Sequence, residues 1–202
     1  MSYRPPELLG PAHELAGFVC ASAEQTDWLV RHARQSMATS TTRVFVVTPT
    51  DSTQVVAFYA WTMAQITVAD APARLRRGAG RYPQPVALLA RLGVDLQHER
   101  QGLGAALLRD VIQRAAAISD DIGCRGLLVH SESEDARRFY LHLIPEFEAS
   151  PTDDLHLVLL LKDIKRTLRV DGGHPYEHRS HDLGMKVDVA DVAEVLDLLD
   201  DD

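Results

Sequence analysis

The chain has 202 residues, 46% of them hydrophobic, which is typical of one globular domain with a substantial core. Its two cysteines have no metal or redox spacing, and no apolar run reaches the length of a membrane span or a signal peptide. These features exclude a disulfide scaffold and a membrane protein and favour a cytoplasmic one. The formal net charge of −8 belongs to the tail, because residues 1–170 hold 19 basic and 19 acidic side chains, whereas residues 171–202 hold 2 and 10.

The first third of the chain predicts one helix and two strands. Residues 24–36 carry an apolar stripe at helical spacing, made of Trp28, Leu29, Ala33 and Met37. Residues 43–47 and 54–63 are rich in β-branched and aromatic side chains, and the segment that joins them has turn chemistry. A basic loop follows at residues 71–85.

The remainder of the domain alternates strands with helices. We expect strands at residues 86–95, 126–130 and 155–161, and helices at residues 104–118 and 132–142. This alternation predicts a mixed α/β (α+β) sandwich in one domain, residues 1–168. Residues 169–202 form an acidic tail with the pattern of one short amphipathic helix.

A glycine turn, Gly102-Leu103-Gly104, opens a helix directly after a strand. Such a turn aims backbone N–H groups and the positive end of a helix dipole at one spot, which is typical of a phosphate or pyrophosphate site. A dinucleotide fold needs a third glycine where Leu107 stands, and a P-loop needs Lys and Ser or Thr after the turn. Both nucleotide interpretations are therefore excluded.

The residues around the turn resemble the GNAT acetyltransferase superfamily, in which an Arg/Gln-x-x-Gly-x-Gly/Ala turn holds the pyrophosphate of acetyl-CoA. The resemblance covers the turn at residues 99–104, the preceding residues 92–95, the strand 126–130 and residues 136–140. The chain is further similar to the acetyltransferase toxins of type II toxin–antitoxin modules, in ordered motifs within residues 6–168. Two positions depart from the pattern: Glu99 replaces the first Arg or Gln, and Ile144-Pro145 replaces a Gly-Phe pair.

The resemblance implies a GNAT fold, a mostly antiparallel mixed sheet whose central strands splay into a V, with acetyl-CoA as cosubstrate and no metal. It implies that Tyr140 donates a proton to the departing thiolate and that the Val94 N–H stabilises the oxyanion. The residues expected to bind acetyl-CoA are Leu92, Val94, Arg100, Gln101, Gly102, Leu103, Gly104, Ala105 and Ser133.

The acceptor implied by the resemblance is the α-amine of the amino acid on charged tRNA, whose acetylation blocks translation. No residue stands out as a dedicated base, which favours an α-amine over a lysine, although Glu99, Asp95 or a water chain could serve. The cations expected to contact tRNA are Arg31, Arg34, Arg74, Arg76, Arg77 and Arg81.

The resemblance also implies a ribbon-helix-helix antitoxin as partner and a homodimer. Two alternatives stay open at this stage. One is a GNAT enzyme that acetylates a protein or small-molecule amine. The other is a catalytically weak CoA-binding regulatory module. The departures from the family pattern at Glu99 and residues 144–145 are what favour this second alternative.

Overall fold

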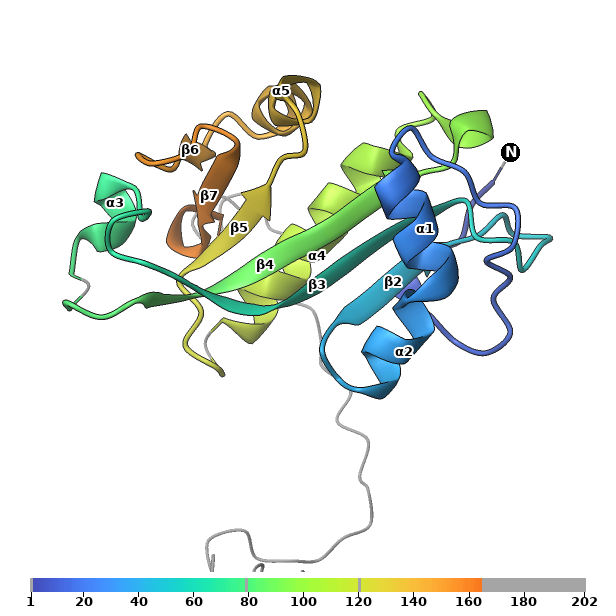
Figure 1. The fold of residues 1–202 in the computed structure, drawn as a ribbon, viewed down its shortest axis with the longest axis horizontal. Coiled ribbons are helices and arrows are strands. Elements are labelled where there is room, and N and C mark those ends of the chain that lie inside the picture. The colour runs from blue at the N-terminus through green and yellow to red at the C-terminus, as the bar shows by residue number, and fades with distance from the viewer. Residues whose placement is uncertain (1, 79, 120, 165–202) are drawn as a thin grey trace, which may run out of the picture.

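The computed structural model describes residues 2–78, 80–119 and 121–164, so the predicted acidic tail lies outside the described residues (Figure 1). Seven strands form one sheet in the order β1-β2-β3-β4-β5-β7-β6, and every neighbouring pair is antiparallel except β4 and β5. The strands are β1 (Glu7–Leu8), β2 (Arg43–Val47), β3 (Ala57–Ile66), β4 (Gln84–Val94), β5 (Gly126–His130), β6 (Glu148–Ala149) and β7 (His156–Leu160).

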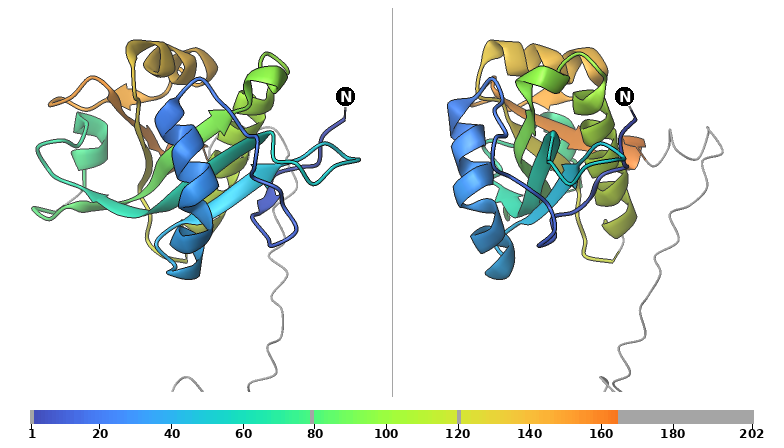
Figure 2. Two further views of the ribbon diagram at one scale, coloured as in Figure 1. Left: turned by 45° about the vertical axis from the view of Figure 1, so that its right-hand side comes forward. Right: turned by 90° about the vertical axis from the view of Figure 1, so that its right-hand side faces the viewer.

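Helices cover both faces of the sheet. α4 packs on one face, while α1, α2 and α3 lie over the other (Figures 1 and 2). The predicted helix at residues 24–36 is two helices that meet at His32. The helices are α1 (Ala23–Arg31), α2 (Ala33–Ala38), α3 (Ala73–Arg76), the 3-10 turn η1 (Leu96–His98), α4 (Leu103–Ile118) and α5 (Glu134–Leu143).

The strand alternation divides the core between the two faces. Leu127 and Val129 of β5 pack in one cluster with Leu107 and the rest of the apolar stripe of α4. Leu128 lies between them in sequence and packs on the opposite face, with Leu75 of α3. On that same face, the apolar stripe predicted for residues 24–36 packs against β2 and β3. A side chain's place along a strand therefore tells which face it occupies.

The central strands part from one another partway along the sheet. β4 and β5 pair only from Ala87–Leu127 to Leu89–Val129, although β4 continues to Val94. A β-bulge lies at the same place, since Arg91 pairs with Ala60 and Leu89 with Trp61, which leaves one extra residue in β4. Because a bulge bends and twists its strand, β4 turns away from β5 here. The expected V-shaped splay is confirmed.

Other expectations are met with small shifts in their ends. The predicted strands at residues 43–47 and 126–130 agree with β2 and β5, and the strand predicted at 54–63 begins at Ala57 and continues to Ile66. The loop at residues 71–85 contains the single turn α3. Within the part of the chain described, no helix combines the length and hydropathy required to cross a membrane.

Candidate active site

The end of β4 presents a free edge to the gap between the two halves of the sheet. Its ladder with β5 stops at Leu89. The N–H of Asp95 donates to the carbonyl of Val56 at 2.9 Å, on the β3 side. Because successive N–H groups of a strand point to opposite sides, those of Val94 and Leu92 point into the gap. The two residues predicted to hydrogen-bond the cosubstrate therefore aim their donors to the same side of β4, into the space where it has parted from β5, which we call the slot.

The carboxylate of Asp95 closes the far end of this edge. It accepts the N–H of Val19 at 2.9 Å through one oxygen and the N–H of Gln97 at 2.9 Å through the other, and the residue is buried. Beside it, the N–H of Leu96 donates to the carbonyl of Val19 at 2.9 Å. Both oxygens of Asp95 thus hold backbone in place, which gives this carboxylate a structural role and argues against a role as base.

The glycine turn combines two left-handed residues with the start of a long helix. Arg100 has a φ of 60° and Gly102 a φ of 80°. A Cβ at Gly102 would meet no atom within 4 Å, so the backbone conformation is what requires glycine there. The first N–H groups of α4, at Leu103, Gly104 and Ala105, have no acceptor within the helix. The turn therefore fits a pyrophosphate, as predicted from the motif.

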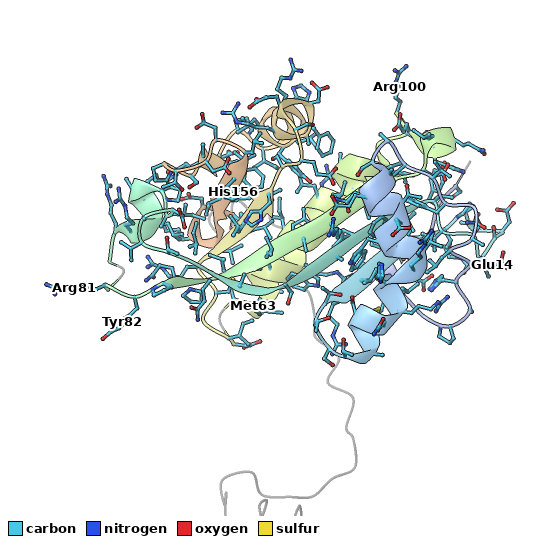
Figure 3. All side chains as sticks on the ribbon, in the orientation of Figure 1. Glu14, Met63, Arg81, Tyr82, Arg100 and His156 are labelled. Atoms are coloured by element: carbon cyan, nitrogen blue, oxygen red, sulfur yellow. The ribbon has the colours of Figure 1, made fainter. Side chains whose placement is uncertain are left out.

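Side-chain hydrogen bonds hold the residues around the turn in place. The hydroxyl of Tyr3 donates to Gln101 Oε1 at 2.6 Å and lies 2.9 Å from Nδ1 of His98. The side chain of Arg100 extends away from the body of the protein (Figure 3). Glu99, the departure from the family pattern, is exposed at the end of η1. The turn thus offers backbone donors, with Arg100 as the adjacent cation.

Gly104 serves packing. A Cβ there would lie 3.1 Å from Cζ of Phe139 and 3.9 Å from Cγ2 of Val94. The missing side chain lets α5, the start of α4 and the end of β4 approach one another closely. One contact therefore joins the three elements that carry the turn, the open edge and Tyr140.

Tyr140, on α5, is buried between two other aromatic rings. Its ring centroid lies 5.3 Å from that of Phe139 and 6.2 Å from that of Phe147. Burial raises the pKa of its hydroxyl well above the ordinary value of 10, and the charge of Glu132 raises it further. Phe147 reaches this position through a tight turn that begins at Ile144, where the sequence departs from the family pattern. The phenol is thus protonated at neutral pH, and its role as an acid stays a prediction.

The hydroxyl of Ser133 caps α5. It accepts the N–H of Ala136 at 3.2 Å, and the residue is exposed at the edge of the gap. Its contact with acetyl-CoA remains a prediction.

A polar cluster lies around the first turn of α1, beside the slot and on the face opposite α4. No motif in the sequence predicts it. Glu132, just beyond β5, accepts Gln25 Nε2 at 2.7 Å and Ser22 Oγ at 3.2 Å. Arg91 of β4 pairs with Glu24 at 2.5 Å. These residues come together only through the fold, because their partners lie far apart in the chain.

Three of the predicted tRNA cations are engaged by neighbouring groups. Arg34 donates to the carbonyls of Gly10 and His13 at 3.0 and 2.6 Å. Arg74 forms ion pairs of 2.8 Å with Glu148 and 2.8 Å with Asp163. Arg31 pairs with Asp27 at 2.8 Å one helical turn away and remains mostly exposed. Arg34 and Arg74 thus stabilise the fold.

The other three arginines, Arg76, Arg77 and Arg81, are exposed on and after α3. Arg81 and Tyr82 project from the tip of the loop (Figure 3), and Tyr82 is 80% exposed. An exposed aromatic ring beside cations suits stacking on a nucleic-acid base. Tyr82 was not among the residues predicted to contact RNA, although its place inside a basic loop is a usable signal.

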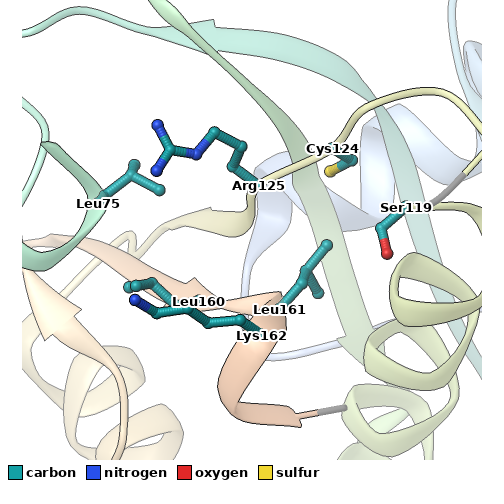
Figure 4. Close-up of a pocket in the computed structure, with 7 residues that line it drawn as sticks. All are labelled: Leu75, Ser119, Cys124, Arg125, Leu160, Leu161 and Lys162. Carbon is teal, nitrogen blue, oxygen red and sulfur yellow. The ribbon is translucent and has the colours of Figure 1, made fainter. Parts of the chain in front are cut away.

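A second hollow, of about 300 Å³, lies at the opposite end of the sheet (Figure 4). Ser119 and Cys124 line it beyond the C-terminal end of α4, and Arg125 and Lys162 stand at its rim. α4 has 16 residues, so the hollow lies roughly 24 Å from the glycine turn at 1.5 Å per residue. It belongs to a different part of the molecule from the open slot.

Comparison with known proteins agrees with this geometry. Residues 64–143 match the Acetyltransferase (GNAT) family. A "tRNA-acetylating toxin" of Mycobacterium tuberculosis (strain ATCC 25618 / H37Rv) is 41% identical over 163 residues, which cover 81% of this chain and 95% of that protein. This chain belongs to the GNAT acetyltransferase family. It is therefore an N-acetyltransferase that uses acetyl-CoA.

Solved structures of other proteins share the fold at lower identity. AtaT complexed with acetyl-methionyl-tRNAfMet superposes with a TM-score of 0.75 at 22% identity, over 83% of this chain and 99% of that one. A mutant AtaT toxin bound to the C-terminus of the antitoxin AtaR and acetyl-CoA gives 0.69 at 20% identity, over 84% and 99%. Among the described residues, no three His, Cys, Asp or Glu side chains gather as a metal site would require.

Proposed function

We propose that this chain transfers the acetyl group of acetyl-CoA to the α-amine of the amino acid on charged tRNA and so blocks translation. The observation that carries the proposal is the 41% identity, over nearly the whole relative, to a protein named a tRNA-acetylating toxin. The structure supports it, because packing at Gly104 brings together the free edge of β4, the glycine turn and the helix that carries the buried Tyr140 phenol. N-acetylation removes the nucleophilic amine that peptide-bond formation needs.

The order of the donors along β4 assigns them roles. A cosubstrate whose pyrophosphate lies on the turn reaches Val94 first and Leu92 second, because Leu92 is nearer to the point where β4 and β5 separate. The N–H of Leu92 is then the better placed donor for the thioester carbonyl, and that of Val94 for the pantetheine arm. This proposal differs from the expectation drawn from the sequence, which gave the oxyanion role to the Val94 N–H. Loss of one such donor costs about 2.7–4 kcal/mol of barrier.

Tyr140 acts on the leaving group. When the tetrahedral intermediate collapses, the C–S bond breaks and the thiolate takes the phenolic proton. The phenol is protonated throughout the neutral range, which is the form that can donate, and its raised pKa keeps it so at alkaline pH as well.

The tRNA lies, in this proposal, across the face of the sheet that carries α1 and α3. Arg76, Arg77 and Arg81 contact phosphates on one side of the slot and Arg31 on the other. Tyr82 offers a stacking surface beside Arg81. Arg34 and Arg74 instead join neighbouring segments of the fold, Arg34 through backbone carbonyls and Arg74 through two carboxylates.

We further propose that the domain comprises residues 1–168, works as a homodimer in the cytoplasm and is neutralised by a ribbon-helix-helix antitoxin. The solved AtaT–AtaR complex supports the antitoxin by analogy. A toxin that acts on tRNA also has its substrate in the cytoplasm.

One experiment tests the acceptor. The protein is incubated with acetyl-CoA and a charged tRNA pool, and N-acetyl-aminoacyl-tRNA is sought by mass spectrometry. Acetylated product on at least one charged tRNA is expected. Acetylation of added protein or small amines without any acetylated tRNA would replace the proposal by the first alternative, a GNAT enzyme for other amines.

A further inference from the structure

Two histidines stack at the point where the sheet opens. His130 is the last residue of β5, and its register partner His156 is the first residue of β7. Their ring centroids are 3.9 Å apart with planes inclined by 21°. This is the closest of the aromatic ring pairs described for the chain, and neither histidine has a role in the mechanism so far.

The pair lies on the acceptor face of the sheet. Leu128 and Val158 pack on the face opposite α4, and His130 and His156 lie two residues from them, so they share that face. Figure 3 shows His156 over the middle of the sheet, between α3 and α1. His130 follows Val129, the last residue of β5 that pairs with β4. The imidazoles therefore stand at the mouth of the slot, on the side from which the amine arrives.

We propose that His130, stacked on His156, accepts the proton that the attacking amine releases. The inference rests on the proposed function and supplies its missing base. Of the bases that the sequence left open, Asp95 has both oxygens occupied by backbone N–H groups, and Glu99 lies exposed at the end of η1, beside the glycine turn. His130 is solvent-accessible, so it can contact a substrate and pass its proton to water.

The step balances in protons and electron pairs. The amine lone pair forms the new N–C bond, the C=O electrons move onto the oxygen facing the β4 N–H groups, and the ammonium proton passes to an imidazole nitrogen of His130. Collapse of the oxyanion then breaks the C–S bond. The thiolate takes a proton from Tyr140, water carries the proton of His130 away, and a proton from water returns to the Tyr140 phenolate.

The surroundings of the pair keep His130 neutral. Burial lowers its pKa from the ordinary 6.5, and a positive charge on His156 lowers it further, while Asp153 acts in the opposite direction. Asp153 lies 3.6 Å from Nε2 of His156, Asp70 also interacts with His156, and Glu132 follows two residues after His130. A neutral imidazole at pH 7 is the form a proton acceptor needs.

The test is the pH dependence of kcat/KM for the full chain and for His130→Gln. Two acceptors are used, charged tRNA and an amino-acid methyl ester. For the unaltered chain, kcat/KM should fall with the square of the proton concentration at low pH, because amine and imidazole must both be neutral. His130→Gln should keep only the first-power dependence of the amine. At pH 7 it should lose about 10²-fold, the lower end for a general base.

Controls separate this role from binding or folding. His142→Gln, on the exposed end of α5, should match the unaltered chain, and both variants should keep its affinity for acetyl-CoA. A His130→Gln profile parallel to that of the unaltered chain would overturn the proposal. Acetylation of the ester alone would overturn the tRNA acceptor while leaving the histidine test intact. Failure of the unaltered chain to acetylate either acceptor would overturn both.

Discussion

Replacement of Tyr140 by phenylalanine isolates the chemistry of one oxygen atom. The residue is 8% exposed and its ring packs against Phe139 and Phe147, contacts that phenylalanine keeps. General acid catalysis contributes about 10²–10⁴-fold, so the barrier should rise by roughly 3–5 kcal/mol. The free energy of unfolding should change by less than about 1 kcal/mol, the usual net worth of one hydrogen bond.

The assay is single-turnover acetylation of charged tRNA, with the affinity for acetyl-CoA and the melting temperature measured alongside. Tyr82→Phe, at an exposed position, is the matched control and should keep the full rate of the chemical step. The pH profile gives a second test, because the rate falls when pH rises through the pKa of a general acid and the acid loses its proton. With the pKa of Tyr140 raised above 10, no alkaline loss is expected below about pH 9. A rate within threefold of the unaltered chain would refute the acid role.

Three further predictions concern the fold and the RNA surface. Gly102→Ala should weaken acetyl-CoA binding in calorimetry and cost about 1–3 kcal/mol in strain, since φ is 80° there; unchanged affinity would remove the turn from the site. Gly93→Ala should lower stability in urea unfolding by about 1–3 kcal/mol, because its Cβ would lie 2.8 Å from Cε1 of Phe58; a variant as stable as the parent would contradict this packing. Joint replacement of Arg76, Arg77 and Arg81 by alanine should raise KM for charged tRNA and reduce its salt dependence by a log–log slope of about 2, at ~0.7 per phosphate contact. An unchanged slope would show that the RNA binds a surface without these three arginines.

The strands and the turn were predictable because their signals are local. β2 and β5 are short apolar runs bounded by polar residues. The glycine turn can be recognised from its residue types alone. β1 and β6 have two residues each, too few to show a period, and exist because neighbouring strands pair with them. The break at His32 likewise has no signal in an apolar stripe that continues across it.

The candidate site divides in the same way. Tyr140 and the turn belong to contiguous motifs, so both could be proposed from the sequence. Arg74 was predicted to bind RNA, but its two carboxylate partners lie 74 and 89 residues away, and no local pattern reports them. The stacked histidines are 26 positions apart and meet only because β5 and β7 pair in that register. Such contacts depend on tertiary structure.

The free edge of β4 has a consequence for folding energetics as well as for catalysis. Most exposed strand edges lie at the rim of a sheet, where charges or bulges protect them from other chains. Here the edge is internal, and pantetheine, whose amides alternate donor and acceptor like a peptide, can pair with it as an additional short strand. The cosubstrate then completes the sheet and stabilises the fold in proportion to the logarithm of its concentration. Acetyl-CoA would thus add to the β4–β5 ladder and the shared core that already join the two halves of the sheet.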